Sequence, residues 1–124
     1  PAFVTAILKD EQPTVYGDGK QSRDFTYVDN VVEANLLAAK AKKTCGEVIN
    51  IACGQAVTVN ETIDTINGLA GRNIKPIYTA PRPGDVKHSL ADITLAKKTI
   101  GYEPKVLFPE GLQKAIGWYR ENLL

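Results

Sequence analysis

The stretch Gly17–Asn30 constrains the fold more than any other part of the sequence. Within Gly17-Asp18-Gly19 the two glycines can supply the positive φ values that a tight turn requires. Residues 24–28 then alternate polar with aromatic or apolar side chains, which predicts a second short strand after a first one at Thr14–Tyr16. Asp29 follows as the expected cap of a helix. The chain therefore reverses direction and enters a helix within a short distance.

Apolar residues recur at helical spacing in several other segments, and short apolar or β-branched runs lie between them. Thr58 and Glu61 match a capping box, and Gly71 is placed to end the helix that follows. The mostly apolar residues 47–52 predict a strand covered on both faces. Asp92 is expected to cap a further short helix. The expected helices span residues 1–8, 29–43, 59–70, 93–100 and 109–123, and the expected strands span residues 14–16, 24–28, 47–52 and 75–78.

These elements predict a mixed fold in which four or five helices alternate with short strands. Such alternation favours α/β or α+β layer packing over a helical bundle. The helix beginning near Asp29 carries an apolar stripe that includes Val28, Val32 and Leu36. The last helix has Pro109 in its first turn and an expected buried stripe. The members of that stripe are Leu112, Ile116, Tyr119 and Leu123.

Composition excludes several classes of function. The 124 residues include 15 basic and 14 acidic side chains without charge blocks, so nothing favours binding to nucleic acid or to an anionic membrane. No apolar run is long enough to span a bilayer, and the N-terminus has no signal-peptide pattern, so we expect a cytoplasmic protein. Cys45 and Cys53 are expected to be free thiols, and no metal site is predicted.

The beginning of the chain is unusual. Pro1 leads directly into a helix-like segment without a cap, and the sequence contains no methionine. We therefore expect a single domain that is a piece of a longer protein.

Two arginines in loops are candidates for binding an anionic ligand. Arg23 follows the glycine turn, and Arg82 stands in a turn with Gly84 and Asp85. A planar guanidinium can donate two parallel hydrogen bonds to a phosphate, so two such loops suit a diphosphate, while Asp85 could accept from ribose hydroxyls. Two structural alternatives stay open: Arg23 is solvated or pairs with a surface carboxylate such as the adjacent Asp24, and Arg82 pairs with Asp85 across its own turn.

Other candidates carry weaker signals. Tyr16 could stack on a base, although a half-buried strand aromatic has the same pattern. His88 has no partner at a catalytic spacing, which favours a surface or hydrogen-bonded structural role. Ser89 is unremarkable by itself, and the pair Trp118-Tyr119 is typical of core or interface packing.

The sequence resembles the extended short-chain dehydrogenase/reductases that act on nucleotide sugars, such as UDP-glucose and UDP-N-acetylglucosamine 4-epimerases. The resemblance covers essentially the whole chain. The matching motifs are Tyr16-Gly17-Asp18-Gly19-x-Gln21-x-Arg23-Asp24-Phe25-x-Tyr27-Val28, Asn50-Ile51 ahead of Thr58-Val59-Asn60-Glu61, Arg82-Pro83-Gly84-Asp85-Val86-Lys87-His88-Ser89, and Glu110-Gly111-Leu112 with Trp118-Tyr119.

The resemblance is to the C-terminal part of that family only. The family's dinucleotide fingerprint GxxGxxG, its catalytic serine or threonine and its Tyr-x-x-x-Lys pair are not found in these residues. The resemblance therefore implies that residues 1–124 form the C-terminal substrate-binding domain, without the Rossmann domain. It also implies that NAD binds elsewhere in the complete enzyme and that this chain alone is inactive.

The resemblance implies a role for each of seven residues. A serine at position 89 would leave room for an N-acetyl group on the sugar, where a large side chain would fill that volume. The expected substrate-binding residues are Thr14, Val15 and Tyr16 at the uracil, Arg23 and Arg82 at the diphosphate, Asp85 at the ribose, and Ser89 near the sugar.

The implied reaction of the complete enzyme inverts C4 of a UDP-sugar, such as UDP-glucose, UDP-galactose or a UDP-N-acetylhexosamine, and the complete enzyme is expected to be a homodimer. Three alternatives stay open: a related enzyme, a binding module, or an inert fragment whose pocket is incomplete because part of the family's substrate site comes from the missing domain. UDP-glucuronate decarboxylases and dTDP-glucose 4,6-dehydratases share the region from the glycine turn to Arg23-Asp24. A binding module without catalysis would use the same pocket.

Overall fold

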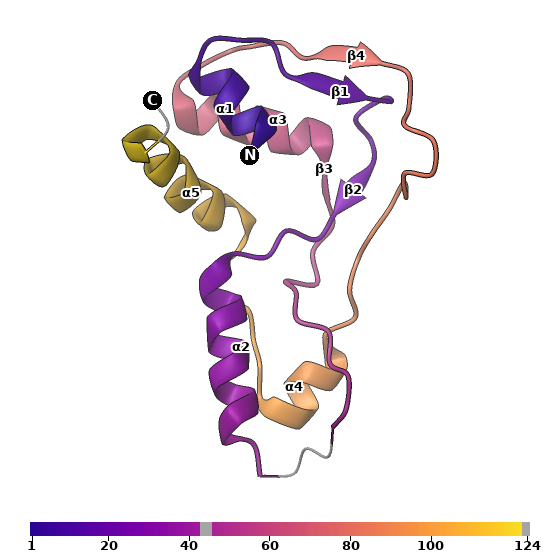
Figure 1. Cartoon of the computed structure of the whole chain (residues 1–124), viewed down its shortest axis with the longest axis vertical. Coiled ribbons are helices and arrows are strands. Elements are labelled where there is room, and N and C mark those ends of the chain that lie inside the picture. Colours follow the sequence, from indigo (N-terminus) through magenta and orange to yellow (C-terminus); the bar gives the residue numbers. More distant parts are fainter. Residues whose placement is uncertain (43–45, 123–124) are drawn as a thin grey trace.

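The computed structural model describes residues 1–42 and 46–122, which form a mixed α/β fold with five helices and short strands (Figure 1). The predicted fold class is confirmed. The elements in chain order are α1 (Ala2–Leu8), β1 (Thr14–Tyr16), β2 (Ser22–Arg23), α2 (Val28–Lys40), β3 (Val57–Thr58), α3 (Val59–Ala70), β4 (Ile77–Thr79), α4 (Thr94–Ile100) and α5 (Phe108–Asn122).

The chain packs around two separate hydrophobic clusters, which lie in the upper and lower parts of Figure 1. The upper cluster joins α1, α3 and α5 to β1, and the lower one joins α2 to α4 and the segment that follows it. The buried residues of the upper cluster are Val4, Ile7, Val15, Ile63, Ile66 and Ile116. Those of the lower cluster are Ala34, Ala96, Ile100 and Tyr102.

Two parallel strands set the positions of the loops with the candidate residues. β1 pairs with β4 in parallel, from Thr14 opposite Ile77 to Tyr16 opposite Thr79. Because parallel strands end at the same edge, the loops that follow them leave the pair side by side. The glycine turn and the loop that begins at residue 80 are therefore neighbours, although they are far apart in the sequence.

The start of α3 has the predicted capping box. The Glu61 amide donates to Thr58 Oγ1 at 3.1 Å, and the Thr58 amide donates to Glu61 Oε2 at 2.8 Å. The Thr58 amide and the Thr58 hydroxyl both donate to the Glu61 carboxylate, and these two bonds lower its pKa. Gly71 ends the helix with φ of 67°, in the left-handed region, as predicted.

The predicted strand at residues 24–28 is wrong. β2 comprises only Ser22–Arg23, and α2 already begins at Val28. A strand needs a backbone partner, and the pairing of β2 with β3 ends at Arg23 opposite Val57. Asp24 instead uses its carboxylate to accept hydrogen bonds from the backbone of another segment. The predicted cap is also wrong, since Tyr27 occupies the cap position without a side-chain hydrogen bond and Asp29 lies in the first turn.

The predicted strand at residues 47–52 is wrong as well. This segment has no strand geometry, and the Val48 side chain is 92 % exposed. A strand requires a neighbouring strand, and the described residues place none beside it. α2 ends at Lys40 rather than near residue 43, and its apolar stripe is exposed at Val28, Val32 and Leu36.

The last two helices agree with prediction in most respects. α4 has Ile93 at its cap position, so the expected cap is displaced by one residue, although Asp92 Oδ1 still accepts from the Thr94 amide at 2.8 Å. In α5, Pro109 lies in the first turn and Ile116 is buried. Leu123 lies outside the described residues.

Cys53 is a free, buried thiol, and its burial together with the charge of Asp24 raises its pKa. Cys45 lies outside the described residues. Among the helices that the structure describes, none combines the length and hydropathy needed to cross a membrane.

The glycine turn is fixed to the N-terminus of α3. The first amides of a helix have no partners within it, and here Val59 N donates to Gln21 O at 3.0 Å and Asn60 N to Gly19 O at 3.0 Å. The Asn60 side chain donates to Asp18 O at 3.2 Å and accepts from the Tyr78 hydroxyl at 3.0 Å. The turn and the helix thus complete each other's hydrogen bonding.

Gly19→Ala tests this attachment. Gly19 has φ of 73°, and a Cβ there would lie 1.8 Å from Asn60 Oδ1, so the methyl group must displace a side chain held by two hydrogen bonds. We expect the free energy of unfolding to fall by about 2–4 kcal/mol, from left-handed strain plus the lost hydrogen bonds. Urea denaturation measures the change.

Gly71→Ala is the matched control, because Gly71 has φ of 67° and open space around its Cβ position. Its cost should be the backbone strain alone, about 1–2 kcal/mol. Equal losses in the two variants would contradict the role given to Asn60.

Candidate ligand-binding site

Tyr16 and Thr14 point outward from β1, whereas Val15 points inward. The Val15 side chain is buried in the upper cluster, while Tyr16 is 40 % exposed. This alternation follows from the period of two along a strand. Of the three residues predicted to meet a base, Val15 can therefore offer only its backbone.

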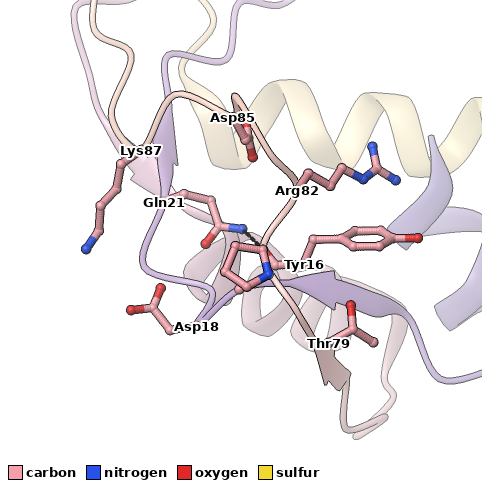
Figure 2. Close-up of a pocket in the computed structure, with 9 residues that line it drawn as sticks. Tyr16, Asp18, Gln21, Thr79, Arg82, Asp85 and Lys87 are labelled. Carbon is pink, nitrogen blue, oxygen red and sulfur yellow. Dashed lines mark hydrogen bonds between the residues drawn. The ribbon is translucent and has the colours of Figure 1, made fainter.

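The guanidinium of Arg82 lies on the ring of Tyr16. Its Cζ atom is 3.9 Å from the ring centroid, and Figure 2 shows the two side chains extending side by side. Such a cation–π contact at an exposed site contributes about 0.5–1 kcal/mol. One face of the Tyr16 ring is therefore covered by an arginine.

Arg23 pairs with Asp85 across 62 positions of sequence. Arg23 Nη2 lies 2.6 Å from Asp85 Oδ1, and Arg23 Nη1 also donates to the Ser22 carbonyl at 2.8 Å. Arg23 therefore pairs with a surface carboxylate, as one structural alternative allowed, but its partner is Asp85 rather than the adjacent Asp24. Among the described ion pairs, Arg82 does not pair with Asp85 across its turn, so that alternative is wrong. The ion pair instead joins the two candidate loops.

These side chains line two clefts that share a wall. A cleft of about 270 Å³, here called the α1 cleft, lies between β1, α1 and the two loops. A cleft of about 460 Å³, here called the Lys87 cleft, lies on the other side (Figure 2). The α1 cleft is lined by Ala2, Phe3, Thr14, Tyr16, Gln21, Arg23, Val59, Arg82 and Asp85. The Lys87 cleft is lined by Tyr16, Gly17, Asp18, Gln21, Thr79, Pro81, Arg82, Asp85 and Lys87.

Five of the seven predicted site residues therefore line the α1 cleft. They are Thr14, Tyr16, Arg23, Arg82 and Asp85. Ser89 is exposed, and it is not among the described residues that line either cleft. Val15 lines neither cleft, since its side chain is buried in the upper cluster.

Gln21 belongs to both clefts and was missed by the sequence analysis as a site residue. Its Nε2 donates to the Tyr16 carbonyl at 2.7 Å, drawn as the dashed line in Figure 2, so it ties the turn back to the end of β1. A polar side chain between the glycine turn and Arg23 was the available signal. Only the structure shows that it supports the residue that bears the aromatic ring.

Charges of both signs surround the Lys87 cleft. The Lys20 amide donates to Asp18 Oδ1 at 2.9 Å, and this bond with the nearby charge of Lys87 lowers the pKa of the Asp18 carboxyl. His88 next to Lys87 is exposed, and its Nδ1 lies 3.0 Å from Ser22 Oγ. The histidine thus has the hydrogen-bonded structural role that the sequence favoured.

Residues 1–115 match the family model described as GDP-mannose 4,6 dehydratase. This chain belongs to that family of nucleotide-sugar epimerases and dehydratases. The resemblance inferred from the motifs is confirmed, and it places the chain with the extended short-chain dehydrogenase/reductases.

Relatives in the family include a UDP-glucuronate 4-epimerase from Thermodesulfobacterium geofontis, which is 34% identical over 122 residues. That match covers 98% of this chain but 37% of the relative, so the chain spans under two-fifths of its length.

Solved structures of family members agree with this placement. The UDP-glucose 4-epimerase of Thermotoga maritima, solved with UDP-glucose, matches with a TM-score of 0.92 and 40% identity over 98% of this chain and 39% of its own. The UDP-glucuronic acid 4-epimerase of Bacillus cereus, solved with UDP-glucuronic acid and NAD, matches with a TM-score of 0.91 and 30% identity over 98% of this chain and 40% of its own.

Arg23→Ala in the absence of ligand should have little effect on stability. The ion-paired side chains of Arg23 and Asp85 are 32% and 41% exposed, and an ion pair this exposed contributes about 1 kcal/mol or less. Urea denaturation should give the same small loss for Arg72→Ala, which removes an ion pair with Asp10 of 2.9 Å far from the clefts. A loss above about 2 kcal/mol for Arg23→Ala alone would show that the fold depends on it.

Proposed function

We propose that residues 1–124 are the C-terminal substrate-binding domain of an NAD-dependent UDP-sugar 4-epimerase. The observation that carries this proposal is the meeting of Arg23 and Arg82, from two distant loops, in one cleft with Tyr16. Two guanidinium groups beside an aromatic ring suit a nucleoside diphosphate, because the ring stacks on the base and the arginines neutralise the phosphates. Family membership supports the same ligand class.

Each side chain has a role in this binding mode. The base lies on Tyr16 and along the backbone of Thr14–Tyr16, the diphosphate lies between Arg23 and Arg82, and Asp85 accepts from the ribose. The α1 cleft alone, at about 270 Å³, is smaller than the usual range of ligand pockets, about 300–1,000 Å³. A UDP-sugar therefore also occupies space that the Tyr16–Arg82 wall now takes.

Binding then exchanges internal partners for ligand groups. Arg82 leaves the face of Tyr16 and meets a phosphate, and the base takes its place on the ring. Asp85 turns from Arg23 to the ribose, and Arg23 meets the second phosphate. The contacts that are given up are each worth about 1 kcal/mol, so charge-assisted bonds to the diphosphate can replace them at a net gain.

A 4-epimerase must both carry out oxidation and reduction at C4 and hold the nucleotide in place, and these two tasks belong to different parts of the complete protein. NAD, held by the rest of the complete protein, would supply the oxidation and the reduction at C4 of the sugar. This chain's residues hold UDP through both half-reactions while the hexose stays free to present its opposite face. Because the chain spans under two-fifths of the relative's length, we propose that it is inactive alone. The resemblance to the family is the ground for proposing that the complete protein is a homodimer.

Calorimetric titration of this chain with UDP, UMP and uridine tests the binding mode. Affinity should increase with each phosphate, and Arg23→Ala or Arg82→Ala should each weaken UDP binding by roughly tenfold to a hundredfold, as expected for the loss of a charge-assisted hydrogen bond. Arg72→Ala, whose ion pair lies elsewhere, should bind UDP normally. Unchanged UDP affinity in both cleft variants would refute the site.

The sugar class is tested in the complete protein by following the products from UDP-glucose and UDP-N-acetylglucosamine. We expect C4 epimers of unchanged mass, whereas a dehydratase would release water from dTDP-glucose. A decarboxylase would release carbon dioxide only from UDP-glucuronate, which is therefore assayed as well, because the other sugars have no carboxyl group to lose. Ser89→Tyr should lower kcat/KM for UDP-N-acetylglucosamine about tenfold more than for UDP-glucose, because the ring fills the acetamido volume. Ser89→Ala should leave both unchanged, and equal losses in the tyrosine variant would contradict the assignment of Ser89.

A further inference from the structure

The loop that carries Arg82 and Asp85 has almost no packing of its own. Every residue from 80 to 90 is exposed. A segment without buried side chains has a low free energy of local opening unless hydrogen bonds or ion pairs hold it. The precise placement of Arg82 and Asp85 therefore depends on the attachments of this loop.

Several of these attachments go to two adjacent residues, Ser22 and Arg23. The Ser22 amide donates to the Lys87 carbonyl at 2.9 Å, and the Ser89 amide donates to the Ser22 carbonyl at 3.1 Å. The Ser22 hydroxyl also meets His88, and Arg23 pairs with Asp85. Backbone and side-chain contacts of Ser22 and Arg23 thus hold the exposed loop in place.

Asp24, the next residue, closes this arrangement at its far end. Its carboxylate faces three backbone amides from two segments: Cys53 N at 3.0 Å to Oδ1, Gly54 N at 2.9 Å to Oδ2 and Ala91 N at 3.4 Å to Oδ2. Ala91 is the residue with which the exposed loop returns to the half-buried part of the chain. The carboxylate therefore joins the end of the loop to the segment after residue 52.

We propose that Asp24 is a positioning residue for the nucleotide diphosphate site. It holds Arg23 from one side and the loop of Arg82 and Asp85 from the other, so that the two guanidinium groups face the same cleft. This inference rests on the proposed function only for the identity of the ligand. The positioning itself rests on the three amide contacts.

A carboxylate is the group that this position requires. Ionised carboxylates accept only, and their two oxygens can serve several donors at once. An asparagine has nearly the same shape but offers one oxygen, and its NH₂ group would face an amide N–H. Asp24→Asn therefore removes acceptors without leaving a cavity, and Asp24→Glu, which keeps both oxygens, should restore part of the function.

The first test reads the loop without any ligand. Trypsin can cut after Lys87, whereas the bond after Arg82 is resistant because proline follows. Mass spectrometry should show cleavage at Lys87 accelerated roughly tenfold by Asp24→Asn at a temperature where thermal melting shows the variant folded, because the open loop becomes more populated. Asp92→Asn is the matched control, because the asparagine Oδ1 can still accept from the Thr94 amide, which lies 2.8 Å from Asp92 Oδ1, and it should leave cleavage at Lys87 unchanged.

The second test compares UDP with uridine. The base meets Tyr16 on β1, whose position does not depend on Asp24, whereas the diphosphate needs both arginine loops. Asp24→Asn should therefore weaken UDP binding by roughly tenfold while changing uridine binding less than twofold. A merely structural role would weaken the binding of both ligands together. Asp24→Glu should restore a larger share of the UDP affinity than of the thermal stability.

Unchanged cleavage at Lys87 in Asp24→Asn, or equal weakening of UDP and uridine, would overturn the proposal. Failure of the unaltered protein to bind UDP would instead overturn the proposed function. In that case the cleavage rates would still decide whether Asp24 holds the loop.

Discussion

The parallel pairing of β1 with β4 is the constraint on which the candidate site depends. It brings Tyr16 beside Thr79, and the two chain segments that leave the pair therefore begin at one edge. The burial of Val15 fixes the rotation of β1, so that Thr14 and Tyr16 face the α1 cleft. Without this pair, Arg23 and Arg82 would stand on unrelated parts of the surface.

The site is electrostatically satisfied before any ligand arrives. Arg82 lies on an aromatic ring and Arg23 on a carboxylate, so neither guanidinium relies on water alone. Both contacts are exposed and weak, and each partner is itself a group that a nucleotide would address. The internal contacts thus keep the two loops ordered while leaving them open to exchange.

Features encoded within a few residues could be predicted from the sequence. The capping box of Thr58 and Glu61 and the left-handed Gly71 depend on local backbone chemistry, and the fold class follows from the alternation of helices and strands. The strands at residues 24–28 and 47–52 were wrong because a strand is defined by a neighbour, which a local pattern cannot supply.

The same reasoning applies to the site. Composition and spacing indicated which loops carry suitable side chains, and family resemblance assigned their order along a ligand. The pairing of Arg23 with Asp85, the stacking of Arg82 on Tyr16 and the support from Gln21 all join positions that only the tertiary fold brings together. Asp24 looked like a surface partner for its neighbour, yet its carboxylate serves the backbone of two distant segments.

The shared wall between the two clefts has a consequence for the design of chemical probes. A compound small enough for the α1 cleft would leave the Tyr16–Arg82 stack intact, whereas in the proposed binding mode a nucleotide would part it. Compounds selected while Arg82 lies on Tyr16 would therefore recognise a different surface from the one that the proposed nucleotide would bind. Fragments chosen separately for the α1 cleft and the Lys87 cleft, and then linked, would separate Arg82 from Tyr16 as the proposed nucleotide would.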